Sequence, residues 1–252
     1  MKEVISIVNR KGGVGKTATA HALGAGLARK GYKILYVDLD SQCNLTYALR
    51  TKASPLTAME VLTGSATAQE AILHSYCGDL IPGSPNLAGA DIAIKDTGKE
   101  YRLKEALDPV AADYDYVIVD TPAALGTLTV NALTAADSVI IPVQAEIYSL
   151  QGIGQLSQVI DSVRKYCNRD LRIDGILITR YNGRAIISRD MQSNLEDAAL
   201  QLDTRLYSTQ IRECVSIKEA QALQQDIFSY APRSNAASDY MAFIDEFLER
   251  SK

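Results

Sequence analysis

A short stretch near the start of the chain combines glycines, two lysines and a threonine at spacings that suit phosphate chemistry. It reads KGGVGKT from Lys11 to Thr17 and follows the apolar run VISIV. Glycines let the backbone curl until several N–H groups point into one concavity, and a helix N-terminus adds partial positive charge. Lys16 would contact the β- and γ-phosphates, and the Thr17 hydroxyl would coordinate Mg²⁺. The segment predicts a site for ATP or ADP with Mg²⁺, against the alternative of an ordinary glycine-rich turn, and its binding residues are Lys11, Gly12, Gly13, Val14, Gly15, Lys16, Thr17 and Ala18.

One feature of this loop departs from the general phosphate-loop pattern. The pattern has glycine where this chain has Arg10, and a second lysine, Lys11, stands inside the loop. Lys11 and Lys16 are five positions apart, so both cannot easily serve the same phosphates from one chain. We expect Lys11 to point out of its own loop and to reach the nucleotide of a neighbouring subunit.

Three aspartates follow apolar runs that are typical of buried strands. Asp38 and Asp40 follow the run 33–37, and Asp120 follows the run 116–119. In an open parallel sheet, ligands bind at the carboxyl ends of the strands, so these carboxylates and the phosphate loop belong to the same edge. The alternative for each is a solvated loop carboxylate or a helix N-cap.

The elements that would position these residues alternate along the chain. Apolar runs bounded by turn residues predict parallel strands, and stretches with helical spacing lie between them. This alternation predicts an α/β fold with a doubly wound, mostly parallel sheet flanked by helices, as a single domain over residues 1–252. Together with the phosphate loop, it predicts a P-loop NTPase. Residues 50–100 read as an insertion with short helices at 56–63 and 68–73 and a strand at 79–82. Later strands are expected at 138–143, 173–179 and 205–210, and helices at 18–30, 149–166, 186–202, 216–223 and 236–250.

The composition excludes several classes of protein. With 47 % hydrophobic and 22 % charged residues the chain is typical of globular proteins, and no stretch approaches the ~20 apolar residues that span a bilayer. The N-terminus lacks the pattern of a signal peptide, so we expect a cytoplasmic protein. The four cysteines form no CxxC pair and are expected to be reduced thiols. The net charge of −4 means that binding of a polyanion would need a local basic patch.

Four segments form a recognisable set. They are KGGVGKT, VDLDSQCN at 37–44, YVIVDTP at 116–122, and Glu219-Ala220 with Tyr230-Ala231-Pro232 before a final helix. The first three resemble the deviant Walker A loop, the DxDxQxN switch and the Walker B strand of the ParA/MinD superfamily of ATPases. The fourth is similar to the ParA/Soj-like chromosome and plasmid partition branch. The resemblance covers nearly the whole chain.

This resemblance implies roles for individual residues. Lys11 matches the signature lysine that crosses the interface of an ATP-sandwich homodimer, where it would act in catalysis together with Lys16. Asp40 matches the carboxylate that orients the attacking water, Asp120 would hold Mg²⁺ through a water, and Asp38 would support the metal shell. The implied activity is a slow, Mg²⁺-dependent ATPase. Departures from the family pattern are Ser41 and Cys43 for Pro and Gly, Ala18 for Thr, and Ala123 for Pro.

The resemblance also implies a base site, a DNA surface and a protein partner. Asn182 and Arg184 match a position that contacts adenine, although Asn-Gly at 182–183 is also a strong turn signal. Non-specific DNA binding by the ATP dimer, at the nucleoid of a bacterial cell, and stimulation by a ParB-like partner are expected of the partition branch. Ser216 stands near the place of the family's arginine before Glu-Ala. The candidate DNA residues are Arg180, Arg189, Arg205, Arg212, Lys218 and Arg233.

Two other functions remain open at this point. A MinD-like membrane ATPase would share the phosphate loop but would need a basic amphipathic helix at its C-terminus. Residues 239–250 are mostly acidic where they are charged, so we expect no membrane partner. A metabolic reductase or small-molecule ligase is the third class, but the cysteines lack the context of a cluster and no substrate pocket is identified.

Overall fold

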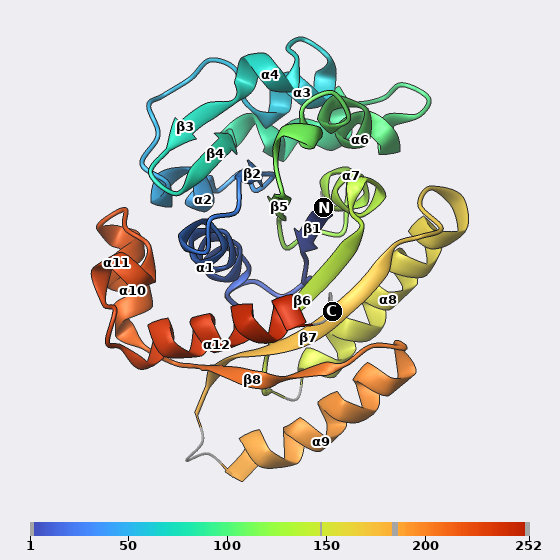
Figure 1. Cartoon of the computed structure of the whole chain (residues 1–252). Coiled ribbons are helices and arrows are strands. Elements are labelled where there is room, and N and C mark those ends of the chain that lie inside the picture. The colour runs from blue at the N-terminus through green and yellow to red at the C-terminus, as the bar shows by residue number, and fades with distance from the viewer. Residues whose placement is uncertain (1–2, 147, 183–185, 250–252) are drawn as a thin grey trace.

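The computed structural model describes residues 3–146, 148–182 and 186–249 of the chain. In that part of the chain, eight strands form one sheet in the order β3-β4-β2-β5-β1-β6-β7-β8 (Figure 1). Neighbouring strands run parallel, except that β3 and β4 at one edge are antiparallel. The strands are β1 (Glu3–Ile7), β2 (Ile34–Asp38), β3 (Leu73–Ser75), β4 (Gly78–Ile81), β5 (Tyr116–Asp120), β6 (Ser138–Gln144), β7 (Arg172–Tyr181) and β8 (Leu206–Arg212).

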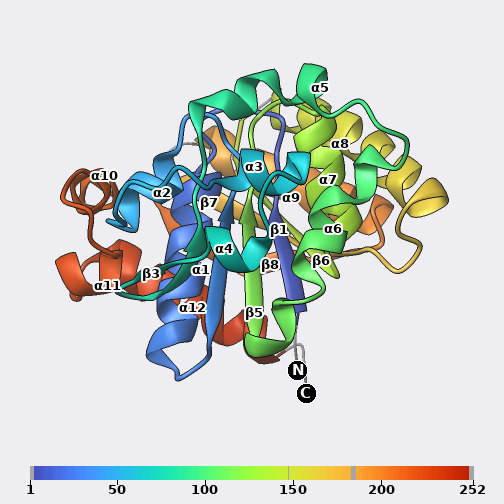
Figure 2. The same cartoon turned by 90° about the horizontal axis from the view of Figure 1, so that it is seen from above.

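Helices cover both faces of the sheet. Helix α1 lies with α10, α11 and α12 against one face, and α6, α7, α8 and α9 pack on the other (Figures 1 and 2). The helices are α1 (Lys16–Arg29), α2 (Asn44–Ala48), α3 (Ala58–Thr63), α4 (Ala68–Ala71), α5 (Ala90–Ala93), α6 (Arg102–Leu107), α7 (Thr127–Ala135), α8 (Tyr148–Tyr166), α9 (Ile186–Gln201), α10 (Val215–Ala222), α11 (Ile227–Tyr230) and α12 (Asn235–Glu249). This arrangement confirms the expected single α/β domain with a mostly parallel, doubly covered sheet.

The central strands are buried on both faces, which explains why they read as unbroken apolar runs. All five residues of β1, β2 and β5 are buried. Each face of the sheet has its own apolar core, one centred on residues such as Val119 and Leu156, the other on residues such as Tyr36 and Phe243. Helix α1 comes close to the sheet because Gly24 lies against the Tyr36 ring, where a Cβ atom would clash.

Residues 50–100 extend the same sheet. The strand expected at 79–82 is β4, and α3 confirms one of the two expected helices. The other expectation, a helix over 68–73, is only partly right, because α4 ends at Ala71 and residues Leu73–Ser75 form β3 instead. A capping box of Thr67 and Glu70 starts helix α4. The helix does not continue, because the next residues pair with β4 as an antiparallel strand. Helix α7 was not anticipated from the sequence.

The register of the sheet fixes which residues share its carboxyl edge. Asp38 at the end of β2 lies beside Asp120 at the end of β5, and Ile7 at the end of β1 lies on the other side of Asp120. None of the helices described is long and apolar enough to cross a membrane.

Candidate nucleotide-binding site

The glycine-rich loop joins the end of β1 to the start of α1. Gly13 and Gly15 adopt φ values of 77° and 85°, which side-chain-bearing residues rarely adopt. Helix α1 begins at Lys16, and its N-cap, Gly15, provides no side chain to pair with the first amides. Val14 is buried and anchors the loop between these turns. The loop therefore presents backbone N–H groups and a helix N-terminus to a cavity, as an anion site requires.

Three polar residues that the sequence did not single out hold this loop in place. Asn9 accepts a hydrogen bond from the Lys11 amide at 2.9 Å, and the Gln144 side chain donates to the Gly13 carbonyl at 3.0 Å. The Thr179 hydroxyl lies 2.7 Å from the Val14 carbonyl. Asn9 follows β1, Gln144 ends β6 and Thr179 lies near the end of β7, so their position at strand ends was the available signal.

Lys16 is buried beside carboxylates. The residue is only 7 % exposed, and its ammonium lies 3.4 Å from the Lys11 carbonyl. Burial lowers the pKa of Lys16, while the charges of Asp120 and Asp40 oppose that shift. A lysine held in this way needs an anion to compensate its buried charge.

Asp120 is fully buried, and among the residues that the structure describes neither of its carboxylate oxygens has a hydrogen-bond partner. Burial and the neighbouring charge of Asp38 raise the pKa of Asp120 well above its usual range, against the influence of the Thr17 hydroxyl and Lys16. Such orphaned oxygens are costly unless a cation or a bound water compensates them. Carboxylate and hydroxyl oxygens are hard ligands that suit Mg²⁺, so Asp120 and Thr17 fit a magnesium site.

Asp38 has a different environment from Asp120, although both are fully buried at adjacent strand ends. Its carboxylate accepts hydrogen bonds from the Thr46 amide at 2.9 Å, the Thr46 hydroxyl at 2.7 Å and the Asp40 amide at 3.1 Å. Burial raises the pKa of Asp38 to about 6, although these hydrogen bonds oppose the shift. Asp38 thus supports the loop after β2, and its participation in the metal shell stays a prediction.

Asp40 lines the main cavity at this edge. The cavity has a volume of about 650 Å³ and opens between the phosphate loop, the loop after β2 and the end of α10. Cys43 in this loop adopts φ 54°, a left-handed conformation that favours the glycine found there in the ParA/MinD pattern. The residues lining the cavity are Gly12, Gly13, Gly15, Lys16, Thr17, Ala18, Asp40, Ser41, Gln42, Asn44, Tyr47, Ala123, Gln221 and Ala222.

Lys11 points away from the phosphates that Lys16 would serve. Its ammonium contacts the carboxylate of Glu146, which follows the end of β6, and its side chain is 31 % exposed. The two lysines of the loop therefore differ in their surroundings. Whether Lys11 reaches a second subunit stays a prediction.

The predicted base-binding residues fall at the edge of the described chain. Asn182 directly follows β7 and is exposed, whereas Arg184 lies outside the described residues. Nearby, Arg180 adopts φ 49° and pairs with Glu213 at 2.8 Å. This segment brings the ends of β7 and β8 together beside the phosphate loop, where a base could lie.

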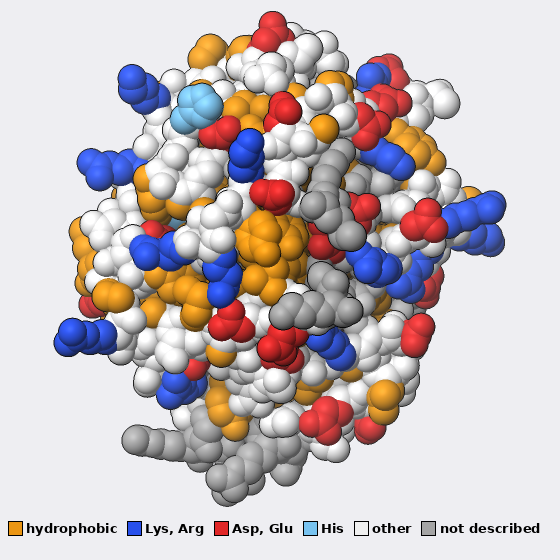
Figure 3. Space-filling model, in the orientation of Figure 1, with side chains coloured by type: hydrophobic (Ala, Val, Ile, Leu, Met, Phe, Trp, Pro, Cys, Tyr) orange, Lys and Arg blue, Asp and Glu red, His pale blue; other side chains and the backbone are white. Residues whose placement is uncertain are grey.

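Among the described residues, the candidate DNA residues do not all lie close together. Arg205 precedes β8 and Arg212 ends it, so about 20 Å separates them. Arg212 makes a two-pronged pair with Asp239, and Arg205 lies 3.6 Å from Asp174. On the face shown in Figure 3, basic and acidic side chains alternate among the coloured residues. Lys218 and Arg233 are exposed, Arg180 pairs with Glu213, and the side chain of Arg189 lies outside the described residues.

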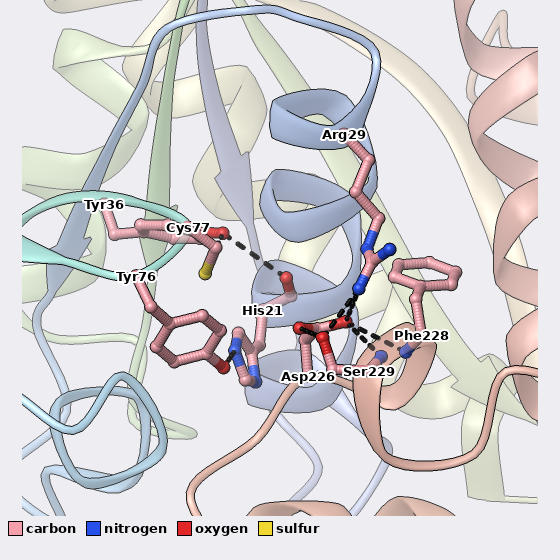
Figure 4. Close-up of polar contacts among 8 residues, drawn as sticks. All are labelled: His21, Arg29, Tyr36, Tyr76, Cys77, Asp226, Phe228 and Ser229. Carbon is pink, nitrogen blue, oxygen red and sulfur yellow. Dashed lines mark hydrogen bonds and ion pairs between the residues drawn. The ribbon is translucent and has the colours of Figure 1, made fainter.

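A second buried polar cluster lies along α1, one turn beyond the phosphate loop (Figure 4). His21 Nε2 lies 2.8 Å from the Tyr76 hydroxyl, which belongs to the turn between β3 and β4. Asp226 caps α11 through the Phe228 and Ser229 amides, each at 2.9 Å, and contacts Arg29 at 3.4 Å. Burial lowers the pKa of His21 to about 4, so the ring is neutral at physiological pH. The cluster ties α1 to two segments that are distant in sequence.

Comparison with known proteins agrees with this geometry. A family profile described as an AAA domain matches residues 2–173. The chain is 39 % identical over 251 residues to the sporulation initiation inhibitor protein Soj of Bacillus subtilis, covering 98 % of each chain. It is 37 % identical over 254 residues to the chromosome partitioning protein ParA of Myxococcus xanthus, covering 98 % of this chain and 88 % of that one.

The similarity extends to a solved structure with bound nucleotide. Cobyrinic acid a,c-diamide synthase from Mycobacterium smegmatis, with bound ADP and magnesium, has 35 % sequence identity and a TM-score of 0.86. The alignment covers 99 % of this chain and 95 % of that one. A protein of the same fold and considerable sequence similarity thus holds the nucleotide and the metal that fit Lys16, Thr17 and Asp120 here.

Proposed function

This chain belongs to the ParA/Soj family of partition ATPases, and from that premise we propose that it is a nucleotide-dependent dimer switch that moves or positions DNA. ATP would bind with Mg²⁺ at the phosphate loop and would be hydrolysed slowly to ADP and phosphate. The observation that carries the proposal is that a buried Lys16 and a buried Asp120 lie at the same end of the sheet, where helix α1 begins without a side-chain cap. Neither oxygen of Asp120 has a hydrogen-bond partner among the residues that the structure describes.

Each residue at the cavity would have its own role in phosphoryl transfer. The loop amides and Lys16 would hold the β- and γ-phosphates, and Thr17 and Asp120 would hold the metal. A magnesium ion held by these two residues would neutralise part of the charge of the phosphates. Asp40 would orient a water whose oxygen attacks the γ-phosphorus, while the bond to the bridging oxygen of ADP breaks. The charge that develops would be stabilised by Lys16 and, in a dimer, by Lys11 of the other subunit.

The dimer is supported by the direction in which Lys11 points. Its ammonium lies at the outer side of the loop, against the exposed carboxylate of Glu146. A cation on an exposed surface beside the nucleotide cavity can be offered to a second copy whose nucleotide faces it. Two such copies would enclose two nucleotides between them. Hydrolysis would remove the γ-phosphates that the two Lys11 side chains contact, so the two subunits would separate.

DNA binding would follow dimerisation. The ATP dimer would bind DNA non-specifically, with a dissociation constant of roughly 10⁻⁴–10⁻⁶ M, mostly through phosphate contacts. Lys218 and Arg233 are exposed candidates for these contacts, whereas Arg205 and Arg212 are engaged by Asp174 and Asp239. A ParB-like partner on the DNA cargo would stimulate hydrolysis and release the dimer.

The membrane-associated alternative is disfavoured by the packing of α12. Its apolar side chains, including Tyr240, Phe243, Ile244 and Phe247, are buried against the domain. A helix that binds a membrane surface keeps such a face free. We therefore favour DNA over lipid as the surface on which the dimer acts.

A small-molecule synthase is the second candidate, because the similar protein from M. smegmatis is a cobyrinic acid a,c-diamide synthase. A synthase would couple ATP turnover to an acceptor, whereas a partition ATPase turns over ATP without one. Hydrolysis by the purified chain in the absence of any acceptor, and its stimulation by DNA, would separate the two.

Sedimentation velocity tests the proposal directly. The protein should sediment as a monomer with ADP and as a dimer with ATP and Mg²⁺, and only the dimer should sediment with DNA. Asp40→Ala should stabilise the ATP dimer by blocking hydrolysis. A monomer in both nucleotide states would overturn the dimer switch.

A further inference from the structure

Thr46 links the loop after β2 to the segment that follows β4. Its hydroxyl donates to the Asp38 carboxylate at 2.7 Å and accepts a hydrogen bond from the Gly83 amide at 2.8 Å. Gly83 lies just beyond β4, 37 positions along the chain from Thr46. One hydroxyl thus joins a buried acid at the nucleotide edge to residues 50–100, for which the sequence suggested no role.

The link continues from Asp38 to Asp40. One Asp38 oxygen accepts both hydrogen bonds from Thr46, and the other accepts from the Asp40 amide at 3.1 Å. The Asp40 carboxylate in turn accepts from the Gln42 amide at 3.0 Å. A continuous chain of hydrogen bonds therefore runs from Gly83 through Thr46 and Asp38 to the backbone of Asp40.

The contact between Gly83 and Asp38 leaves no spare room. A Cβ atom on Gly83 would lie 2.9 Å from Cγ of Asp38 and 3.0 Å from one of its carboxylate oxygens. Since Asp38 is fully buried, it cannot move aside into solvent. The carboxylate is confined between Thr46 on one side and the Gly83 backbone on the other.

We propose that Thr46 is a positioning residue for ATP hydrolysis, acting through Asp38 to hold Asp40 where it orients the attacking water. This inference rests on the proposed ATPase function and deepens it, because it assigns a role to a residue that does not line the nucleotide cavity. Loss of the Thr46 hydroxyl would leave the Gly83 amide unpaired and would loosen Asp38. Asp40 would then sample several orientations, while the phosphate loop would keep its shape.

A structural reading of the same contacts is that Asp38 only caps α2. Thr46 is the third residue of this helix, and its amide bonds to Asp38 as in an N-terminal cap. Thr46→Val separates the two readings, because valine keeps the amide and the shape but removes the hydroxyl. Thr46→Ser is the matched control, because it restores the hydroxyl without the methyl group.

The experiment compares wild type, Thr46→Val, Thr46→Ser and Asp40→Ala in ATP binding and in single-turnover hydrolysis. We expect Thr46→Val to lower kcat by about 10- to 100-fold, as misplacement of a catalytic group does, with the Kd for Mg-ATP within about twofold of wild type. Thr46→Ser should recover most of the rate. Thermal unfolding of each variant with bound Mg-ADP reports whether the fold is retained.

Each outcome bears on a separate claim. If wild type turns over ATP and Asp40→Ala does not, but Thr46→Val matches wild type, the positioning role is overturned and the proposed function stands. Equal losses in Thr46→Ser and Thr46→Val also overturn it, because the hydroxyl would then be irrelevant. If wild type shows no turnover, the proposed function itself fails. Should Thr46→Val not fold, Gly83→Ala decides, since its Cβ displaces Asp38 with Thr46 intact: a lower kcat supports the role and an unchanged kcat overturns it.

Discussion

The ammonium of Lys11 contacts the carboxylate of Glu146 within the same chain. Lys11 is the residue that the ParA/MinD pattern assigns to a second subunit's nucleotide. In a single copy it is instead paired with Glu146, which follows β6. Formation of the dimer would therefore exchange Glu146 for a phosphate as the partner of Lys11.

Removing this internal partner should favour the dimer. Glu146→Gln leaves Lys11 free, and because both side chains are partly exposed the pair stabilises the single copy by at most about 1 kcal/mol. The ATP-dependent dimer should then form up to about fivefold more tightly at low salt, with a smaller effect at high salt. Asp245→Asn, which removes the exposed partner of Lys30, is the control. Sedimentation equilibrium with Mg-ATP measures the change, and equal behaviour of both variants would contradict the exchange.

The two lysines of the loop should separate binding from assembly. Lys16→Ala should weaken Mg-ATP binding by about 10- to 100-fold, the equivalent of losing one or two hydrogen bonds to charged groups. Lys11→Ala should retain binding but lose the ATP dimer. Isothermal titration and sedimentation on the same samples test both expectations. A Lys11→Ala variant that still dimerises with ATP would place that lysine outside the interface.

Asp120 should couple stability to the metal. Its buried oxygens have no hydrogen-bond partner in the described part of the chain, and its pKa is raised. Asp120→Asn should therefore stabilise the nucleotide-free chain by on the order of 1–3 kcal/mol in urea unfolding. The same variant should lose most of the thermal stabilisation that Mg²⁺ adds to the ADP-bound wild type. Ala123→Gly, at a neighbouring site on the cavity, is the control for a local change. Unchanged Mg²⁺ dependence in Asp120→Asn would remove it from the metal site.

His21 should make the fold sensitive to acid. The pKa of its ring is about 4 in the folded chain against 6.5 for an exposed histidine, so the unfolded chain binds a proton first as pH falls. Above pH 6.5 the ring is neutral in both the folded and the unfolded chain, so His21 does not lower the free energy of unfolding. Between pH 6.5 and 4 the free energy of unfolding should fall by about 3 kcal/mol. Urea unfolding across this range, compared with His21→Gln, measures the contribution. Parallel pH profiles in the two proteins would show that His21 is not responsible.

The exposed basic residues should dominate DNA binding. Lys218→Ala should weaken binding of the ATP dimer to random duplex DNA and lower its salt slope by about one, as loss of one phosphate contact does. Arg205→Ala should leave both quantities unchanged, because Arg205 lies about 20 Å from Arg212 at the other end of β8 and packs on Tyr207. Fluorescence anisotropy at several salt concentrations measures both. If Arg205→Ala weakens DNA binding and Lys218→Ala does not, the DNA surface lies near the start of β8 instead.

The sequence by itself determined the parts of this protein whose chemistry is local in the chain. The phosphate loop, its uncapped helix and the aspartates that end β2 and β5 could be predicted, because a strand, a turn and a helix lie within a few residues of each other. Burial on both faces also made the parallel strands readable as apolar runs. The shared edge of Asp38 and Asp120 followed from the rule that parallel strands end together, and the register confirms it.

Only the tertiary structure decided which distant groups meet. Thr46 and Gly83, Asn9 and Pro142, and Thr179 and Val14 are joined by hydrogen bonds that span 37 to 165 positions of sequence. Such contacts depend on strand order and on how each loop packs, and no local pattern encodes either. The same holds for the strand at Leu73–Ser75, where pairing with β4 outweighed a helix start, and for the separation of Arg205 from Arg212. The spacing of residues within a short segment indicates what chemistry that segment can perform. Which segments share a site depends on the sheet, because it brings the ends of strands together whatever their distance in sequence.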